Sequence, residues 1–128
     1  MKSILIVDDD LGFVYWLGHL LDTLTHSALP AESVPDAARL VRQLDLKVDL
    51  LVLNPKLSGG VDFIAALRRS QPNIRVIGIQ DDSWELAKVP GVNATHPRPT
   101  DFNESTITAW IECIEQVLGE TIAGDNRS

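Results

Sequence analysis

Several features that define specialised protein classes are missing from this sequence. Its single cysteine, Cys113, has no second cysteine with which to form an internal disulfide and no companion at metal-ligand spacing. The apolar run near the start of the chain ends at Asp8, far short of a membrane span or a signal peptide. We therefore predict a cytoplasmic protein with no membrane segment.

Basic residues are also scarce. Eleven lysines and arginines stand against eighteen acidic residues, which gives a formal net charge of −7. A surplus of negative charge repels a polyanion and leaves no broad positive surface for phosphate contacts. The composition therefore argues against nucleic-acid binding.

The composition is otherwise that of an ordinary folded domain. The chain has 128 residues, of which 45% are hydrophobic and 23% are charged. This length suits one domain with one core, and the hydrophobic content argues against disorder. We predict one domain over residues 1–119, where the last helix would end at Gly119, followed by a flexible C-terminal tail over residues 120–128.

Apolar runs of strand length alternate with segments of helical periodicity. This alternation is typical of right-handed βαβ units and predicts an α/β fold with a parallel sheet covered on both faces. Because Pro30 lacks an N–H, its strand is predicted at an edge of the sheet. The expected strands are Ile4–Val7, Ala28–Ser33, Leu50–Leu53, Ile74–Ile79 and Val92–His96. The expected helices are Leu11–Leu24, Pro35–Leu46, Val61–Gln71, Ser83–Lys88 and a last one beginning near Asp101, where Asp101 and Glu104 have the spacing of a capping box.

Polar residues follow the expected strands at their carboxyl ends, where ligands bind in open α/β sheets. The first strand leads to Asp8, Asp9 and Asp10, and the third ends at Asn54. Adjacent carboxylates suit a hard cation such as Mg²⁺. Acidic residues also cap the first turn of a helix, so both interpretations stay open.

Four segments together resemble the response-regulator receiver family: the strand ILIVDDD, the segment VDLLVLNPKLSGG, the strand IRVIGI and the segment GVNATHPRP. The resemblance extends over nearly the whole chain. It implies a doubly wound, flavodoxin-like fold with a five-stranded parallel sheet of order 2-1-3-4-5 and five helices. It also implies a signalling or interaction domain and not an enzyme.

The resemblance places Asp8 and Asp9 on the family's pair of metal-binding acids, and Lys56 would supply its backbone carbonyl ligand. The family's phosphoacceptor aspartate aligns with Asn54. A neutral amide lacks the anionic oxygen that attacks phosphorus. Deamidation is also blocked because the next residue, Pro55, has no N–H to attack the side chain. We therefore expect no acyl phosphate at Asn54.

Three further positions depart from the family and complete a degenerate phosphorylation site with Asn54. Gln80 replaces a serine or threonine, Arg98 replaces a lysine, and Thr95 replaces an aromatic switch residue. As a hypothesis, Arg98 forms a bidentate pair with Asp8 or Asp9 in place of the metal ion. The alternative is an Arg98 side chain that lies in solvent. We expect no cofactor, with at most weak Mg²⁺ binding.

The last helix has apolar residues beyond its narrow core stripe: Trp110, Cys113 and Val117. Together with Trp84 in the short fourth helix, they predict a partner surface. In receivers, the fourth helix, the fifth strand and the fifth helix commonly form such a face, so a protein partner or a homodimer is expected there. The alternative is that these residues cover the sheet.

The first helix carries three aromatic residues, Phe13, Tyr15 and Trp16, although its core positions are already filled. We predict that one of them contacts a partner. The chain's three histidines have no metal-ligand spacing and are expected on the surface.

These observations favour a phosphorylation-independent signalling or adaptor domain of a two-component-type pathway. One alternative is a receiver that is phosphorylated on another side chain, such as Asp62 or Ser58. A second is a haloacid-dehalogenase-like phosphatase using Asp8 and Asp10, although Gly12 stands where that family has threonine. A third is a small-ligand or flavin module on the same fold.

Overall fold

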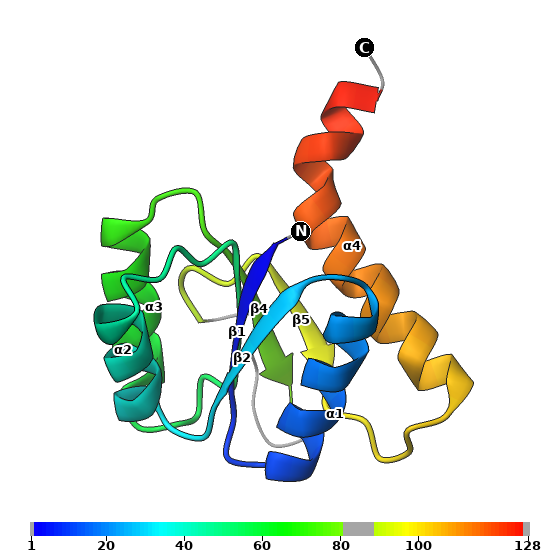
Figure 1. Cartoon of the computed structure of the whole chain (residues 1–128), viewed down its shortest axis with the longest axis horizontal. Helices are drawn as coiled ribbons and strands as arrows, with labels where there is room; N and C mark the ends of the chain where they lie inside the picture. The colour runs from blue at the N-terminus through cyan, green and yellow to red at the C-terminus, as the bar shows by residue number, and fades with distance from the viewer. Residues whose placement is uncertain (1, 81–88, 127–128) are drawn as a thin grey trace.

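A computed structural model describes residues 2–80 and 89–126, with side chains as far as residue 119. Five strands form one parallel sheet in the order β2-β1-β3-β4-β5 (Figure 1). The predicted fold class is therefore confirmed, and the strand that contains Pro30 lies at an edge as expected. The strands are β1 Ser3–Val7, β2 Ser27–Ala31, β3 Leu50–Leu53, β4 Arg75–Gln80 and β5 Ala94–Pro97.

Helices cover both faces of the sheet (Figure 1). The helices α1 (Leu11–Thr23) and α4 (Glu104–Asn126) pack on one face, and α2 (Val34–Gln43) and α3 (Gly60–Ser70) pack on the other. The expected helix Ser83–Lys88, including Trp84, lies outside the described residues. None of the helices within residues 2–80 and 89–126 is both long and apolar enough to cross a membrane.

The first two helices begin where the sequence provides a side-chain cap. Asp10 precedes α1, and its Oδ1 accepts a hydrogen bond from the backbone N–H of Phe13 at 3.1 Å. Ser33 precedes α2, and its Oγ accepts one from the N–H of Asp36 at 3.2 Å. Both bonds satisfy an N–H that has no partner within the helix.

The last helix differs from the prediction at both ends. The expected start near Asp101 is too early, because Asn103 is the capping residue and its Oδ1 accepts from the N–H of Thr106 at 2.9 Å. The helix also continues through Gly119 to Asn126. A glycine inside an exposed helix costs about 1 kcal/mol relative to alanine, which is too little to end a helix by itself.

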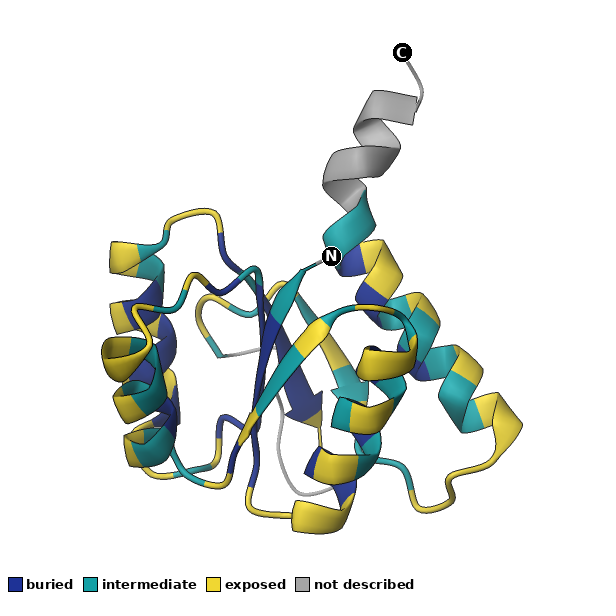
Figure 2. Ribbon diagram, viewed as in Figure 1, coloured by how far each residue is buried: buried dark blue, intermediate teal, exposed yellow. Residues whose placement is uncertain are grey.

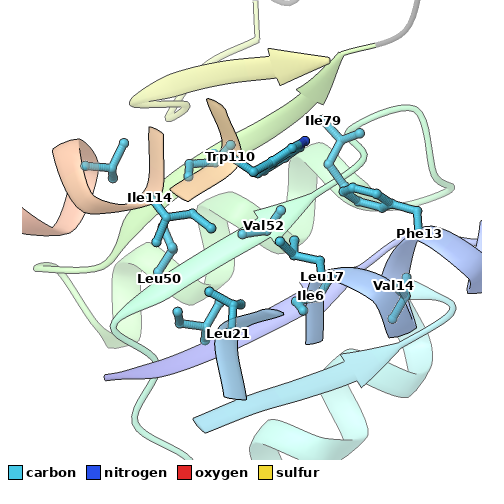
Figure 3. Packing of buried hydrophobic residues seen from close by; sticks show 13 residues of the cluster. Ile6, Phe13, Val14, Leu17, Leu21, Leu50, Val52, Ile79, Trp110 and Ile114 are labelled. Carbon is cyan, nitrogen blue, oxygen red and sulfur yellow. The ribbon is translucent and has the colours of Figure 1, made fainter. Parts of the chain in front are cut away.

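The core consists of two apolar layers, one on each face of the sheet. Every residue of β3 is buried, as are Ile4–Val7 of β1, which is typical of central strands in a parallel sheet. The burial of the neighbouring strand β4 can be seen in Figure 2. In the layer beneath α1 and α4, the largest fully buried side chains are Trp110 and Phe13, whose ring centroids are 5.4 Å apart (Figure 3).

The predicted partner surface on the last helix is wrong for two of its members. Trp110 is 0% exposed and Val117 is 5% exposed, and both belong to the core, while Cys113 is half-buried against the same layer. The physical reason is that α4 packs on β4 and β5 while Trp110 also contacts Phe13 of α1. A helix with neighbours on several sides buries a wider apolar face than a narrow core stripe.

His96 is also less exposed than predicted, and this gives the fold a pH dependence. The half-buried imidazole lies edge-on to Trp110, with 4.5 Å between the ring centroids. Burial lowers the pKa of His96 from its ordinary value of 6.5, because the charged form loses solvation. A lowered pKa contributes stability that is present above about pH 6.5 and is lost as the pH falls through the lowered value.

We expect His96→Gln to weaken the acid sensitivity of the fold. Urea unfolding at about pH 7.5 and about pH 5 measures the loss of stability on acidification. The wild type should lose more than the variant, because only the wild type has to protonate this histidine. Equal losses in the two proteins would contradict the assignment.

Candidate functional site

Two polar side chains are buried in the part of the chain that the structure describes, and they lie at neighbouring strand ends. Asp8 follows β1 and is 0% exposed, and Asn54 follows β3 and is 6% exposed. Parallel strands deliver their carboxyl ends to the same edge of the sheet, so these two residues meet there. The loop after β5 adds Arg98 at the same place.

Both carboxylate oxygens of Asp8 have hydrogen-bond donors. Arg98 donates from Nε to Oδ2 at 3.1 Å and from Nη2 to Oδ1 and Oδ2, both at 2.9 Å. Asn54 donates from Nδ2 to Oδ1 at 3.1 Å, and the backbone N–H of Asp9 donates to the same oxygen at 2.9 Å. The arginine therefore makes the bidentate pair that the sequence predicted for Asp8 or Asp9, with Asp8 as its partner.

The amide of Asn54 is held in one orientation. Its Oδ1 accepts a hydrogen bond from the backbone N–H of Lys56 at 3.0 Å, which directs Nδ2 toward Asp8. An amide provides both a donor and an acceptor, and both are used here. An ionised aspartate at this position would have no donor for Asp8.

The ionisation of Asp8 depends on these neighbours. Burial raises the pKa of Asp8, while the hydrogen bond from Asn54 and the positive charge of Arg98 oppose this rise. Desolvation is the largest of these effects. Loss of Arg98 would therefore leave an acid whose charged form is strongly disfavoured.

Besides its hydrogen bonds to Asp8, Arg98 has two further contacts at the site. Its backbone N–H donates to the carbonyl oxygen of Gln80 at 3.1 Å, and its Nε lies 3.7 Å from Oδ2 of Asp10. Its side chain is 25% exposed, whereas that of Asp8 is fully buried. Of the predicted residues, Gln80 thus joins the site through its backbone, and its side chain is exposed.

Three other predicted site residues lie on the surface. Asp9 and Lys56 are exposed beside the site, and Thr95 is exposed on β5. Among the described residues, no group of three or more acidic, histidine or cysteine side chains is arranged to hold a metal ion. With both oxygens of Asp8 bound to Arg98, the residues present do not fit the Mg²⁺ site that the receiver resemblance implies. The role of the Lys56 carbonyl stays a prediction.

Reasoning from the sequence missed one functional contact, the hydrogen bond from Asn54 to Asp8. In the sequence, Asn54 indicates only the loss of a nucleophile. The signal for the contact was nevertheless present, because replacing an acid by its amide adds a donor, and a second acid was predicted at the neighbouring strand end.

No protein-family model and no curated protein matches the chain. Solved structures of response regulator receiver domains share its fold. A CheY-like receiver domain protein from Methanospirillum hungatei is 19% identical with a TM-score of 0.79, and the match covers 97% of this chain and 98% of that one. A receiver domain protein from Clostridium thermocellum is 17% identical with a TM-score of 0.75, covering 96% and 98%. A response regulator from Thermotoga maritima, in complex with Mg²⁺-BeF, is 18% identical with a TM-score of 0.69, covering 92% and 100%.

Proposed function

We propose that this chain is a receiver-type signalling domain that acts by protein contact in a two-component-type pathway, without accepting a phosphoryl group. One observation carries the proposal: the buried carboxylate of Asp8 is bound by Arg98 and Asn54, at the positions where receivers place a lysine and the phosphoacceptor. We also keep the predictions of a cytoplasmic location and of a domain that is not an enzyme.

The amide at position 54 cannot serve as the nucleophile. Its nitrogen lone pair is delocalised into the carbonyl, and its oxygen carries no full negative charge. Both ends of the amide are also committed, to Asp8 on one side and to the N–H of Lys56 on the other. A phosphoryl donor would therefore meet no free anionic group at the end of β3.

The guanidinium of Arg98 supplies positive charge at the carboxylate of Asp8, which a metal ion would otherwise bind. A carboxylate paired with arginine in two hydrogen bonds is already neutralised, and Mg²⁺ would have to displace the guanidinium to reach it. The site would then keep one arrangement at any Mg²⁺ or phosphoryl-donor concentration. Because the site itself does not change, binding of the partner is the event through which such a domain signals.

The test is incubation of the full chain with acetyl phosphate and Mg²⁺, followed by intact-mass measurement, and a parallel NMR titration with beryllofluoride and Mg²⁺. We expect the wild type to gain no phosphoryl mass and to show no shift at the amides around Asp8. A matched control is Asn54→Asp combined with Arg98→Lys, which installs both family residues and should show Mg²⁺-dependent shifts there. A stable adduct on the wild type would overturn the proposal.

Peptide mapping of the treated protein tests the remaining alternative, which is a receiver phosphorylated on another side chain. Ser58 and Asp62 are both exposed near the start of α3, so both are accessible to a phosphoryl donor. A phosphoryl group found on either residue would mean that the domain is regulated by phosphorylation at a non-standard position.

The phosphatase alternative is disfavoured by how Asp8 and Asp10 are used. Asp8 would have to attack phosphorus with an oxygen that is bound to Arg98, and an Asp10 oxygen caps α1. Hydrolysis of p-nitrophenyl phosphate that disappears in Asp8→Asn would reverse this conclusion.

A further inference from the structure

A groove at the free edge of the sheet carries an inference about the partner. It has a volume of about 400 Å³ and lies between α1 and α2, beside β2. Two of its residues are large exposed hydrophobics on α1, namely Leu11 at 42% and Tyr15 at 62% exposure. The apolar part of its lining consists of Leu11, Val14, Tyr15, Pro30, Ala31 and Leu40.

The charged groups of the groove leave an excess of negative charge. Arg39 is its only basic residue, and its Nη2 is bound to Oδ1 of Asp36 at 2.7 Å. Glu32 is exposed and forms no ion pair within the described part of the chain. The groove therefore presents one unpaired carboxylate beside an apolar wall.

The edge of β2 adds acceptors but few donors. The N–H of Ser27 and the carbonyl of Ala31 both bond to the β1 side, so the alternate residue Pro30 faces the free edge. Pro30 has a carbonyl acceptor and no N–H, which also prevents a partner strand from pairing regularly here. A ligand for this edge must bring hydrogen-bond donors of its own.

We propose that this groove binds a cationic and apolar segment of a protein partner. The aliphatic stem of an arginine or lysine would lie against Leu11 and Tyr15, and its charged head would reach Glu32 and the outward carbonyl of Pro30. A second copy of this chain is a poor occupant, since two molecules of net charge −7 repel each other. The inference rests on the proposed function, because it supplies the contact through which a domain without phosphorylation would signal.

The test is a ¹⁵N NMR titration of the full chain with the peptide acetyl-Leu-Arg-Leu-amide, with acetyl-Leu-Glu-Leu-amide as the matched peptide control. We expect the arginine peptide to shift the amides of Leu11, Tyr15, Glu32 and Leu40 with a Kd on the order of 1 mM, since it is a fragment of a full interface. The glutamate peptide should cause no shift at these residues.

Single substitutions test whether the arginine peptide binds in the groove. Tyr15→Ala and Glu32→Gln should each weaken binding at least about threefold, because one removes the apolar wall and the other the unpaired charge. Leu44→Ala is the matched control, since Leu44 is 55% exposed and lies outside the groove. All three residues are on the surface, so circular dichroism should show a retained fold.

The inference would be overturned by no shift at about 10 mM arginine peptide, by equal shifts with both peptides, by shifts centred elsewhere, or by full affinity in Glu32→Gln. Concentration-dependent self-association that Tyr15→Ala abolishes would also overturn it, because a second copy would then occupy the groove. The readout is separate from the phosphorylation test. A phosphoryl adduct on the wild type refutes the proposed function, whereas loss of peptide binding refutes the groove alone.

Discussion

Trp110→Ala is expected to lower the free energy of unfolding by about 3–5 kcal/mol, the usual cost of truncating a buried tryptophan or phenylalanine to alanine. The indole is 0% exposed and packs against Phe13 at 5.4 Å and His96 at 4.5 Å between ring centroids. Truncation removes contacts with α1 and β5 together and leaves a cavity under α4. Urea unfolding followed by circular dichroism measures the loss through the midpoint.

Trp110→Phe is the matched control for this prediction. The indole N–H has no hydrogen-bond partner among the residues that the structure describes, so phenylalanine removes no hydrogen bond and only some volume. It should cost clearly less than alanine. If alanine were tolerated within about 1 kcal/mol, Trp110 would have to lie on an exposed partner surface and not in the core.

The strands, their carboxyl ends and the edge position of the Pro30 strand were predictable because their signals are local, whereas the full order 2-1-3-4-5 was implied by the receiver resemblance. Apolar runs such as Leu50–Leu53 mark central parallel strands wherever they occur, and Pro30 marks an edge because it lacks an N–H. Since the carboxyl ends of such strands meet, the sequence also predicted that Asp8, Asn54 and Arg98 would lie together. Charge and the geometry of the guanidinium made a pair with Asp8 or Asp9 one of two interpretations of Arg98, and the structure shows the pair with Asp8.

The width of a buried helix face was not predictable in the same way. The pattern of α4 shows which residues are apolar, but how many of them are covered depends on α1, β4 and β5 arriving from elsewhere in the chain. Trp110 was misplaced for this reason. The groove beside β2 was missed on the same grounds, because Tyr15 and Glu32 come from different elements that only the fold brings together.

Arg98→Ala is expected to cost about 3 kcal/mol at neutral pH, because it leaves the buried carboxylate of Asp8 without its counter-charge. Arg98→Lys is the matched control and should cost less, since an ammonium keeps the charge but cannot donate in the same bidentate geometry. Adding Asp8→Asn to Arg98→Ala should recover part of the loss, because no buried charge then remains. A double variant less stable than Arg98→Ala alone would show that the unpaired charge of Asp8 is not what destabilises Arg98→Ala.

The cost of Arg98→Ala should also depend on pH in a defined direction. Burial already raises the pKa of Asp8, and removing the opposing charge of Arg98 raises it further. An acid with a raised pKa in the folded state contributes stability at low pH that is lost as the pH rises through that pKa. The deficit of the variant relative to the wild type should therefore shrink on acidification, and a deficit that is constant with pH would point to lost packing of the arginine stem.

The effect of Mg²⁺ on stability tests whether Arg98 occupies the position of a metal ion or only forms an ion pair with Asp8. If Arg98 occupies the position of the cation, its removal should free the carboxylate of Asp8 for Mg²⁺, with the exposed Asp9 beside it. Mg²⁺ at about 10 mM should then raise the unfolding midpoint of Arg98→Ala and leave the wild type unchanged, because a ligand stabilises only the form that binds it. Equal effects on both proteins would mean that Arg98 and the metal do not compete, and that the arginine is a neighbour of the acid site and not its cation.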